Sequence, residues 1–461
     1  MSPLAYLAIY GWIPFVLYLY KRVPAQKAVV ISFIIAWLFL PQFNIVLPGI
    51  PDLTKASATA YGILLATIVF DVKRLSAYRF AWIDIPIVIF CLCPIVTALS
   101  NGLGVYDGVS MIMLQIVTWG IPYFLGRIYL ADLTGARQLA VGIFLGGLAY
   151  VPFCLYEVRM SPQLHLMIYG FRAHQDFSQT IRWGGFRPTV FMIHGLAVAA
   201  FMMAASLIGL WLWKSGTIKK INDIPMRWLA IALVVTFILC KSTGAYFLLF
   251  LGIALLYLCS QLRTTVPVLL LAVAMVVYLF ISSQTDAYVT DQAVEGLSNL
   301  LPPDRIQSLE FRFNNEEVLS DIAREKPIFG WGGWGRSLLY DDDGKLITVP
   351  DSLWIIEYGE KGAVGLTSMM ALLLLPPLTV LTQRCPPKLW MRPEYAPLAA
   401  LSITVMMYTI ECLLNAMINP IYILACGSLS GIALRPVVPQ AKRRQVAMPP
   451  NLSPQSYSRL S

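Results

Sequence analysis

The sequence predicts an all-α fold, a polytopic transmembrane helical bundle of about 12 to 14 spans with one large, partly helical extracytoplasmic loop. Composition is the first indication. Of the 461 residues, 58% are hydrophobic and only 13% are charged, whereas roughly a quarter of an ordinary soluble domain is charged. The second indication is the recurrence of apolar runs near the roughly 20 residues that cross a bilayer. The third is a basic cluster in every second loop between these runs. A soluble multidomain fold is therefore excluded.

Thirteen apolar runs are expected to be membrane spans. The weakest are the short runs at 58–70 and 228–240. In chain order, the expected spans lie near residues 3–20, 28–48, 58–70, 82–99, 109–130, 138–157, 188–212, 228–240, 245–262, 264–283, 353–381, 396–414 and 417–435.

The charges of the chain are separated along the sequence. The net charge is +9, but residues 281–352 contain thirteen acidic and six basic residues, a net −7 that leaves +16 elsewhere. Because short cytoplasmic loops of membrane proteins are enriched in Lys and Arg, the loops after the first, third, seventh and eleventh runs are expected in the cytoplasm. The acidic segment is then extracytoplasmic. Nucleic acid is not needed as a partner to explain the basic balance.

Four regions are predicted on this topology. Residues 1–283 form transmembrane helices and include an external loop at 158–187, and residues 284–352 form the large extracytoplasmic loop. Residues 353–436 form the C-terminal transmembrane helices. Residues 437–461 form a cytoplasmic tail whose content of Pro, Ser and Asn is typical of disorder.

Neither a metal site nor a cofactor is predicted. All eight cysteines lie in or beside apolar runs, where cysteine behaves as a small hydrophobic residue. The aspartates at 341–343 precede Gly344, but the register of an EF-hand would place Leu339 and Pro350 at its first and last ligand positions. A solvated acidic turn is the expected structure there.

The external stretch from residue 159 to residue 187 is basic where the topology favours neutral loops. Arginine suits bidentate phosphate recognition, so a lipid pyrophosphate at the outer membrane surface is a candidate ligand. The alternative is that these arginines reach toward anionic lipid headgroups. The stretch contains four arginines and one acid, and all three histidines of the chain fall in it or just beyond it. The arginines are Arg159, Arg172, Arg182 and Arg187, the acid is Asp176, and the histidines are His165, His174 and His194.

A glycine-rich stretch lies in the acidic segment and reads Pro327-Ile-Phe-Gly-Trp-Gly-Gly-Trp-Gly-Arg336. Its glycines allow backbone amides to turn toward a ligand, Trp331 and Trp334 offer flat faces to a sugar ring, and the final arginine supplies charge. The alternative is a tight turn that packs the two tryptophans.

Charged residues also interrupt the start of the run at 353–381. Glu357 and Lys361 are one helical turn apart, so they are expected to pair with each other. Asp351 has no such local partner in the sequence, which makes it the preferred candidate for chemistry.

Four ordered motifs resemble those of the O-antigen ligase and O-antigen polymerase family, polytopic enzymes of the outer face of the bacterial inner membrane. They cover roughly residues 180–370, and their order and spacing carry the resemblance. In chain order they are Arg182-x-Gly-Gly-Phe-Arg187 with His194-Gly-Leu-Ala197, then Lys241-Ser-Thr-Gly-Ala, then Arg312 with the Pro327 loop, and finally Asp351-Ser-Leu-Trp with Glu360-Lys-Gly-Ala-Val-Gly365.

The resemblance implies a multi-pass inner-membrane glycosyltransferase of O-antigen or exopolysaccharide biosynthesis, with its active site on the extracytoplasmic face. Such an enzyme transfers or polymerises glycan from an undecaprenyl-pyrophosphate-linked donor onto a sugar hydroxyl of a glycan or lipid acceptor, here expected without a metal. The implied residues are Asp351, Arg182 and Arg336 for catalysis and Arg187, Arg312, His174, His194, Trp331 and Trp334 for substrate binding.

The last motif departs from the family pattern. Asp351 stands where most members have a histidine, the proposed base for the acceptor hydroxyl in the ligases, and Ser352 stands in place of an asparagine. A carboxylate can take a hydroxyl proton if burial raises its pKa toward neutrality. The alternative is that the role passes to His174 or His194. The departure argues against a standard lipopolysaccharide ligase. A polymerase and a divergent glycan transferase remain open as the function.

Two other classes of function remain open. One is a transporter or flippase of a lipid-linked glycan, and the other is a non-catalytic membrane subunit of polysaccharide export machinery. A translocation path should place polar groups through the bilayer, yet the runs at 28–48, 245–262 and 264–283 contain no charged residue. This favours chemistry at the membrane surface.

Overall fold

The computed structural model describes residues 2–174, 176–284 and 303–435, and it is 72% helical. Within these residues, nine helices are long and apolar enough to cross a membrane, and four shorter apolar helices accompany them. The chain is therefore a mostly helical, multi-pass membrane protein, as the apolar runs predict. Two predicted features lie outside the described residues: the tail at 437–461 and, within the large loop, residues 285–302.

Each predicted apolar run corresponds to one helix or to a helix extended by a short π-helical turn. In chain order these are α1 (Pro3–Arg22), α2 (Ala25–Phe39), α3 (Lys55–Phe70), α5 (Ile85–Ser100), α6 (Val105–Gln115) with η2 (Ile116–Gly120) and α7 (Ile121–Tyr129), α8 (Leu133–Met160), α10 (Gly195–Lys214), α11 (Met226–Leu239), α12 (Thr243–Leu262), α13 (Val266–Gln284), α16 (Leu353–Thr379) with η4 (Val380–Arg384), α17 (Ala396–Leu414) and α18 (Pro420–Leu434).

Shorter elements connect these helices. They are α4 (Val72–Ser76), η1 (Trp82–Asp84), α9 (Leu164–Tyr169), η3 (Phe177–Thr180), η5 (Pro387–Leu389), the antiparallel hairpin of β1 (Ile181–Arg182) and β2 (Gly185–Phe186), and the antiparallel hairpin of β3 (Lys220–Ile221) and β4 (Ile224–Pro225). One long helix of low hydropathy, α15 (Pro303–Arg324), belongs to the acidic segment.

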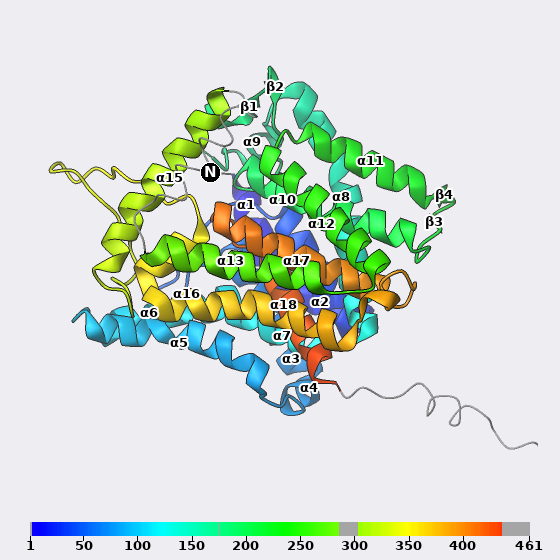
Figure 1. Cartoon of the computed structure of the whole chain (residues 1–461), viewed down its shortest axis with the longest axis horizontal. Coiled ribbons are helices and arrows are strands. Elements are labelled where there is room, and N and C mark those ends of the chain that lie inside the picture. Colours follow the sequence, from blue (N-terminus) through cyan, green and yellow to red (C-terminus); the bar gives the residue numbers. More distant parts are fainter. Residues whose placement is uncertain (1, 175, 285–302, 436–461) are drawn as a thin grey trace, which may run out of the picture.

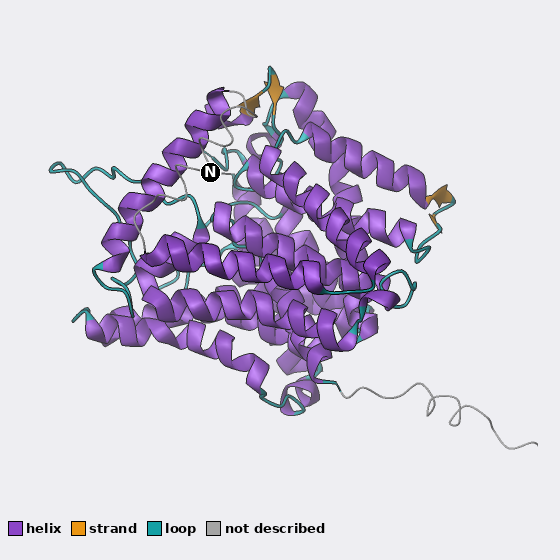
Figure 2. Cartoon of the chain, in the orientation of Figure 1, coloured by secondary structure: helices purple, strands orange, loops and turns teal. Residues whose placement is uncertain are grey.

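The long helices run along the longest axis of the molecule, and α15 lies across one end of them (Figure 1). The β3–β4 hairpin lies at the opposite end, and the strands of the described residues form two small hairpins at the margins of the bundle (Figure 2). Because α15 packs on both α13 and α16, it covers the ends of these two helices.

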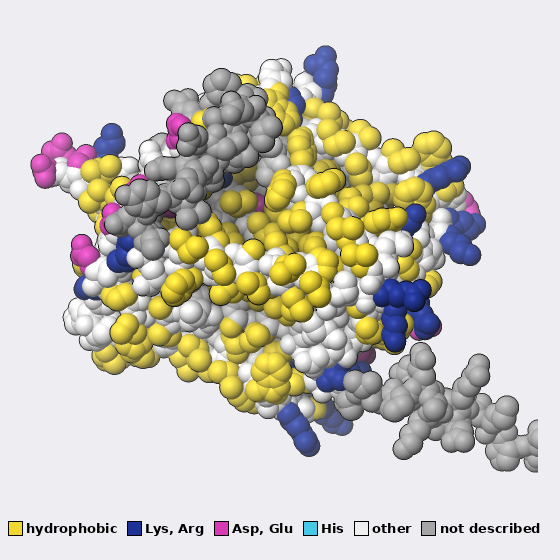
Figure 3. Space-filling view, in the orientation of Figure 1, with side chains coloured by type: hydrophobic (Ala, Val, Ile, Leu, Met, Phe, Trp, Pro, Cys, Tyr) yellow, Lys and Arg dark blue, Asp and Glu magenta, His cyan; other side chains and the backbone are white. Residues whose placement is uncertain are grey.

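Charge is separated between the two ends of the bundle (Figure 3). An apolar belt covers the middle, acidic side chains gather at the end that holds α15, and basic side chains gather mainly at the end that holds β3 and β4. We call these the acidic end, which includes the hairpin at 341–343, and the basic end, which includes Lys219, Lys220 and residues 384–392. The charge separation of the sequence is therefore also a separation in space.

The central spans are α10 and α17, which have 83% and 89% of their apolar windows buried inside the molecule. α10 is rich in Ala and α17 contains Ala, Ser and Thr, and small side chains allow neighbouring helices to approach closely. Polar groups at the ends of these two helices therefore lie on the axis of the bundle, where they can contribute to a shared site.

The span predicted at 188–212 begins later than its hydropathy indicates. Residues 188–194 form irregular chain, and α10 starts only at Gly195. The amides of Thr189 and Val190 are bound by the carboxylate of Glu157, which prevents helical pairing there. This irregular segment carries His194 into the acidic end.

Candidate functional site

The external loop predicted at 158–187 is fixed to the bundle by one buried carboxylate. Glu157, near the end of α8, has no exposed surface. Its Oε1 accepts the amides of Gln163 and Leu164 at 3.0 and 2.9 Å, and its Oε2 accepts those of Thr189 and Val190 at 2.8 and 2.7 Å. Because hydrogen bonds to a carboxylate are stronger than those between neutral groups, this cluster sets the positions of both ends of the loop.

The two arginines of the first motif meet the second motif through the backbone. Nη2 of Arg187 donates to the carbonyl of Lys241 at 2.8 Å, and Nζ of Lys241 donates to the carbonyl of Arg182 at 3.0 Å. Arg187 is 3% exposed. A Cβ on Gly185 would collide with Nζ of Lys241, and one on Gly195 would collide with the Arg187 side chain. Gly195 thus allows Arg187 to pack closely against the start of α10, whereas a side chain at Gly185 would displace the amino group of Lys241.

His194 caps α10 in a defined tautomer. Its Nδ1 accepts the amide of Leu196 at 3.0 Å, so in the neutral ring the proton resides on Nε2. Nε2 lies 2.8 Å from Oε1 of Gln179 and donates to it. The ring is therefore a hydrogen-bond donor toward the loop, with no nitrogen lone pair left to accept a substrate proton.

Four basic groups surround this histidine. The pKa of His194 is lowered to about 4, first by burial and then by these neighbouring charges. They are Arg187, His174, Arg182 and Arg312. The structure thus brings together five residues that the sequence analysis assigned to the site, and the rings of His174 and His194 lie 5.3 Å apart.

The third histidine has a structural role. Nε2 of His165 accepts the amide of Gln42 at 3.1 Å, and Nδ1, which then carries the proton, donates to the carbonyl of Phe171 at 2.7 Å. Burial lowers the pKa of His165, so this bridge between two loops holds a neutral ring. Of the three histidines that cluster in the sequence, His174 and His194 therefore lie at the site and His165 lies beside it.

Helix α15 adds a second group of charges next to the arginines. Arg312 forms an ion pair with Asp351, with 3.4 Å between Nε and Oδ2. One turn further along, Oε1 of Glu316 accepts the hydroxyl of Ser352 at 2.5 Å, and Oε2 accepts the hydroxyl of Tyr278 at 3.4 Å. Burial raises the pKa of Glu316. Arg312 joins the two groups, since it also acts on His194.

Glu411 supplies a further carboxylate from the end of α17. It is 4% exposed, and its Oε1 accepts Nδ2 of Asn415 at 2.9 Å. Arg312 is its basic neighbour. Sequence reasoning missed Glu411 and Glu316. The signal for the first was an acid inside an apolar run, and for the second its position one helical turn after Arg312.

The glycine-rich stretch packs against helix α16 of the same chain. Residues 327–332 lie against a break in α16 at Gly362, whose φ is +62°. The amides of Trp331 and Gly332 donate to carbonyls of residues 359 and 360 at 2.9 Å each, and the amide of Ala363 donates to the carbonyl of Pro327 at 2.8 Å. A Cβ on Gly330 would collide with the α16 backbone. These contacts match the alternative of a tight packed turn.

The remaining predicted residues lie away from the arginine cluster. Arg336 makes a two-pronged ion pair with Asp107 of α6 at 3.0 and 3.1 Å. Nε1 of Trp331 donates to the carbonyl of Ile322 at 2.7 Å, whereas Trp334 is 67% exposed. Figure 1 separates α6 widely from the β1–β2 hairpin, so the structure does not join Arg336 to the other predicted arginines.

The charges in α16 pair as expected. Nζ of Lys361 lies 2.5 Å from Oε2 of Glu357 and 3.3 Å from Oε2 of Glu360. All three side chains are satisfied beside the break in the helix, so this cluster is explained by pairing within the span.

No family model matches the chain, and a search of the curated proteins finds no match. The resemblance described from the motifs therefore stays a prediction.

Proposed function

We propose that the chain is an inner-membrane glycosyltransferase that transfers or polymerises glycan from an undecaprenyl-pyrophosphate-linked donor onto a sugar hydroxyl, at the extracytoplasmic face and without a metal. One observation carries the proposal. The hairpin arginines Arg182 and Arg187, Lys241, and the pair of Arg312 with Asp351 lie far apart in the sequence but meet at the acidic end. Each of these residues belongs to one of the motifs on which the resemblance rests.

The arginines would bind the pyrophosphate of the donor. Arg182, Arg187 and Arg312 concentrate positive charge beside a neutral His194 that donates from Nε2. When the bond between the anomeric carbon and the pyrophosphate breaks, negative charge develops on the leaving group. Fixed positive groups in a partly desolvated site offset that charge, which is the role that a metal ion fills elsewhere.

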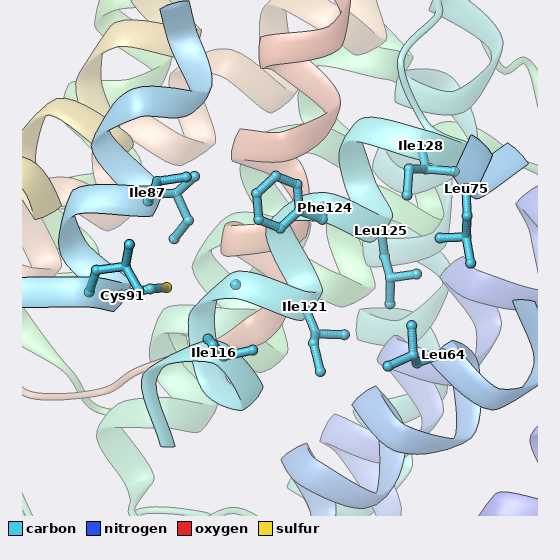
Figure 4. A pocket seen from close by; sticks show the side chains of 12 residues that line it. Leu64, Leu75, Ile87, Cys91, Ile116, Ile121, Phe124, Leu125 and Ile128 are labelled. Carbon is cyan, nitrogen blue, oxygen red and sulfur yellow. The ribbon is translucent and has the colours of Figure 1, made fainter. Parts of the chain in front are cut away.

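The lipid part of the donor needs an apolar surface next to these charges. A cleft of about 830 Å³ lies between α13 and α16, and its lining runs from Leu378 to Ser283 and Pro327 at the acidic end. Its walls are almost wholly apolar, which suits a polyprenyl chain. A smaller cavity of about 320 Å³ between α3, α5 and α7 is lined by residues such as Ile87 and Phe124 (Figure 4), but α15 does not border it.

The reaction is a single displacement. The hydroxyl oxygen of the acceptor forms a bond to the anomeric carbon, a carboxylate takes the hydroxyl proton, and the bonding electrons leave with the polyprenyl pyrophosphate. Displacement in one step predicts inversion at the anomeric carbon. Asp351 is the carboxylate that the sequence indicates, and it lies in the site through its ion pair with Arg312.

The test compares cells lacking the gene with cells carrying Arg182→Ala or Asp351→Ala, with lipid-linked intermediates measured by mass spectrometry and polymer length by gel. The control is Arg172→Ala, an exposed arginine on the same loop. We expect the deletion and both site variants to accumulate unpolymerised lipid-linked units while the control makes normal glycan. Normal glycan in both site variants, with none in the deletion, would instead support a transporter or a non-catalytic subunit.

A further inference from the structure

The proposed reaction requires a proton acceptor, and the groups that the sequence suggested for it are engaged elsewhere. The lone pair of His194 Nδ1 is used by the amide of Leu196. Nδ1 of His174 lies 3.1 Å from the amide of Asp176. Asp351 is paired with Arg312. The carboxylate of Asp351 is thus already occupied by a guanidinium partner.

Glu316 has the surroundings that a general base needs. It lies on α15, which covers the acidic end, and its side chain is half-buried, so it is accessible but partly desolvated. Its two oxygens accept the hydroxyls of Ser352 and Tyr278, which orient the carboxylate from α16 and α13. Arg312, on the same face of α15, links it to the arginine cluster.

We infer that Glu316 is the general base that accepts the proton of the attacking sugar hydroxyl, an inference that rests on the proposed glycosyl transfer. The acceptor O–H bond breaks as its oxygen bonds to the anomeric carbon, the proton passes to a carboxylate oxygen of Glu316, and the bond to the pyrophosphate breaks with its electron pair. Ser352 and Tyr278 are positioning residues that hold the carboxylate, and Asp351 holds Arg312.

The surroundings of Glu316 fix the expected pH dependence. Burial is the main influence on its pKa, which is raised, while the hydroxyls of Ser352 and Tyr278 and the charge of Arg312 oppose that rise. Because the charged carboxylate is the active form, the rate should increase with pH through this raised pKa. Removing the hydroxyl of Ser352 removes a donor to the charged form, so it should shift the rise in rate to higher pH.

The experiment uses membranes that contain the full-length chain and, as probe, the lipid-linked glycan extracted from cells lacking the gene. Consumption of this donor and release of polyprenyl pyrophosphate are measured between about pH 5 and 9, the range in which perturbed carboxylates titrate. The variants are Glu316→Gln, Glu316→Asp and Ser352→Ala. Glu317→Gln is the matched control, because its side chain is exposed on the adjacent position of the same helix.

We expect Glu316→Gln to lower the rate by about 100-fold or more, the usual contribution of a general base, and to abolish the rise with pH. Glu317→Gln should match the wild type, Glu316→Asp should keep the rise, and Ser352→Ala should shift it upward. The inference is overturned if Glu316→Gln remains within about threefold of wild type, below the usual range for a general base, or if it is slow but keeps the rise.

The shift in Ser352→Ala tests the inference even if Glu316→Gln does not fold, and an unchanged pH profile there would overturn it. Failure of the proposed function gives a different result. In that case wild-type membranes do not consume the donor, and both proposals fall together.

Discussion

The anchoring of the external loop by Glu157 gives the most quantitative prediction. In Glu157→Gln one oxygen remains and the other is replaced by an NH₂ group, whichever way the amide turns. Two of the four amide hydrogen bonds are then lost, and two N–H donors face another donor. Each hydrogen bond to a charged group contributes about 1.5 to 3 kcal/mol.

The loss of two such bonds corresponds to about 3 to 6 kcal/mol, and water entering the loop would recover part of it. We therefore expect a net loss of about 2 to 4 kcal/mol and, for a chain of this length, a fall in Tm of about 2 to 4 °C. The assay is thermal unfolding in detergent, together with limited trypsin digestion at the exposed Arg172. Digestion should become faster because both ends of the loop are released.

The control for this prediction is Glu394→Gln, a change of the same chemistry at an exposed position between η5 and α17. It should leave both Tm and the digestion rate unchanged. If Glu157→Gln behaves like this control, the four amide bonds do not hold the loop, and the account of how Arg182 and Arg187 are positioned is refuted.

Three further predictions concern the site and its support. Lys241→Met removes the hydrogen bond from Nζ to the Arg182 carbonyl. It should lower the rate of donor consumption by about tenfold, the effect of one lost hydrogen bond. An unchanged rate would show that the β1–β2 hairpin does not contribute to the site. Gly362→Ala should lower the stability by more than ~2 kcal/mol in thermal unfolding, because alanine at this positive φ would collide with the backbone of Ile328; an unchanged Tm would contradict the close packing. Product formation in membranes should be the same with and without EDTA, and strict dependence on an added divalent ion would refute the assignment of charge neutralisation to arginine.

The sequence predicts the spans because their signal is local. Each apolar run corresponds to a helix, and the pairing of Glu357 with Lys361 follows from helical spacing alone. The helix α10 starts later than the apolar run because Glu157 binds the amides of Thr189 and Val190 within residues 188–194. Hydropathy does not record such a contact.

The site was predicted less completely because it depends on contacts between distant segments. Arg336 resembled a phosphate ligand in the sequence, but Asp107, more than two hundred residues earlier, pairs with it. Ser352 looked like a departure from a motif, and its partner Glu316 lies on another helix. Residue types and spacing identified the arginines, whereas only the fold identified which carboxylates lie beside them.

The central claim is that the chain itself catalyses glycan transfer. The most direct test is reconstitution of the purified full-length chain in liposomes with the lipid-linked glycan extracted from cells lacking the gene as both donor and acceptor. The account predicts an elongated glycan and the release of one polyprenyl pyrophosphate for each unit added, with both lost in Arg187→Ala. Movement of the intact donor across the bilayer without elongation, or no change in the donor at all, would contradict it.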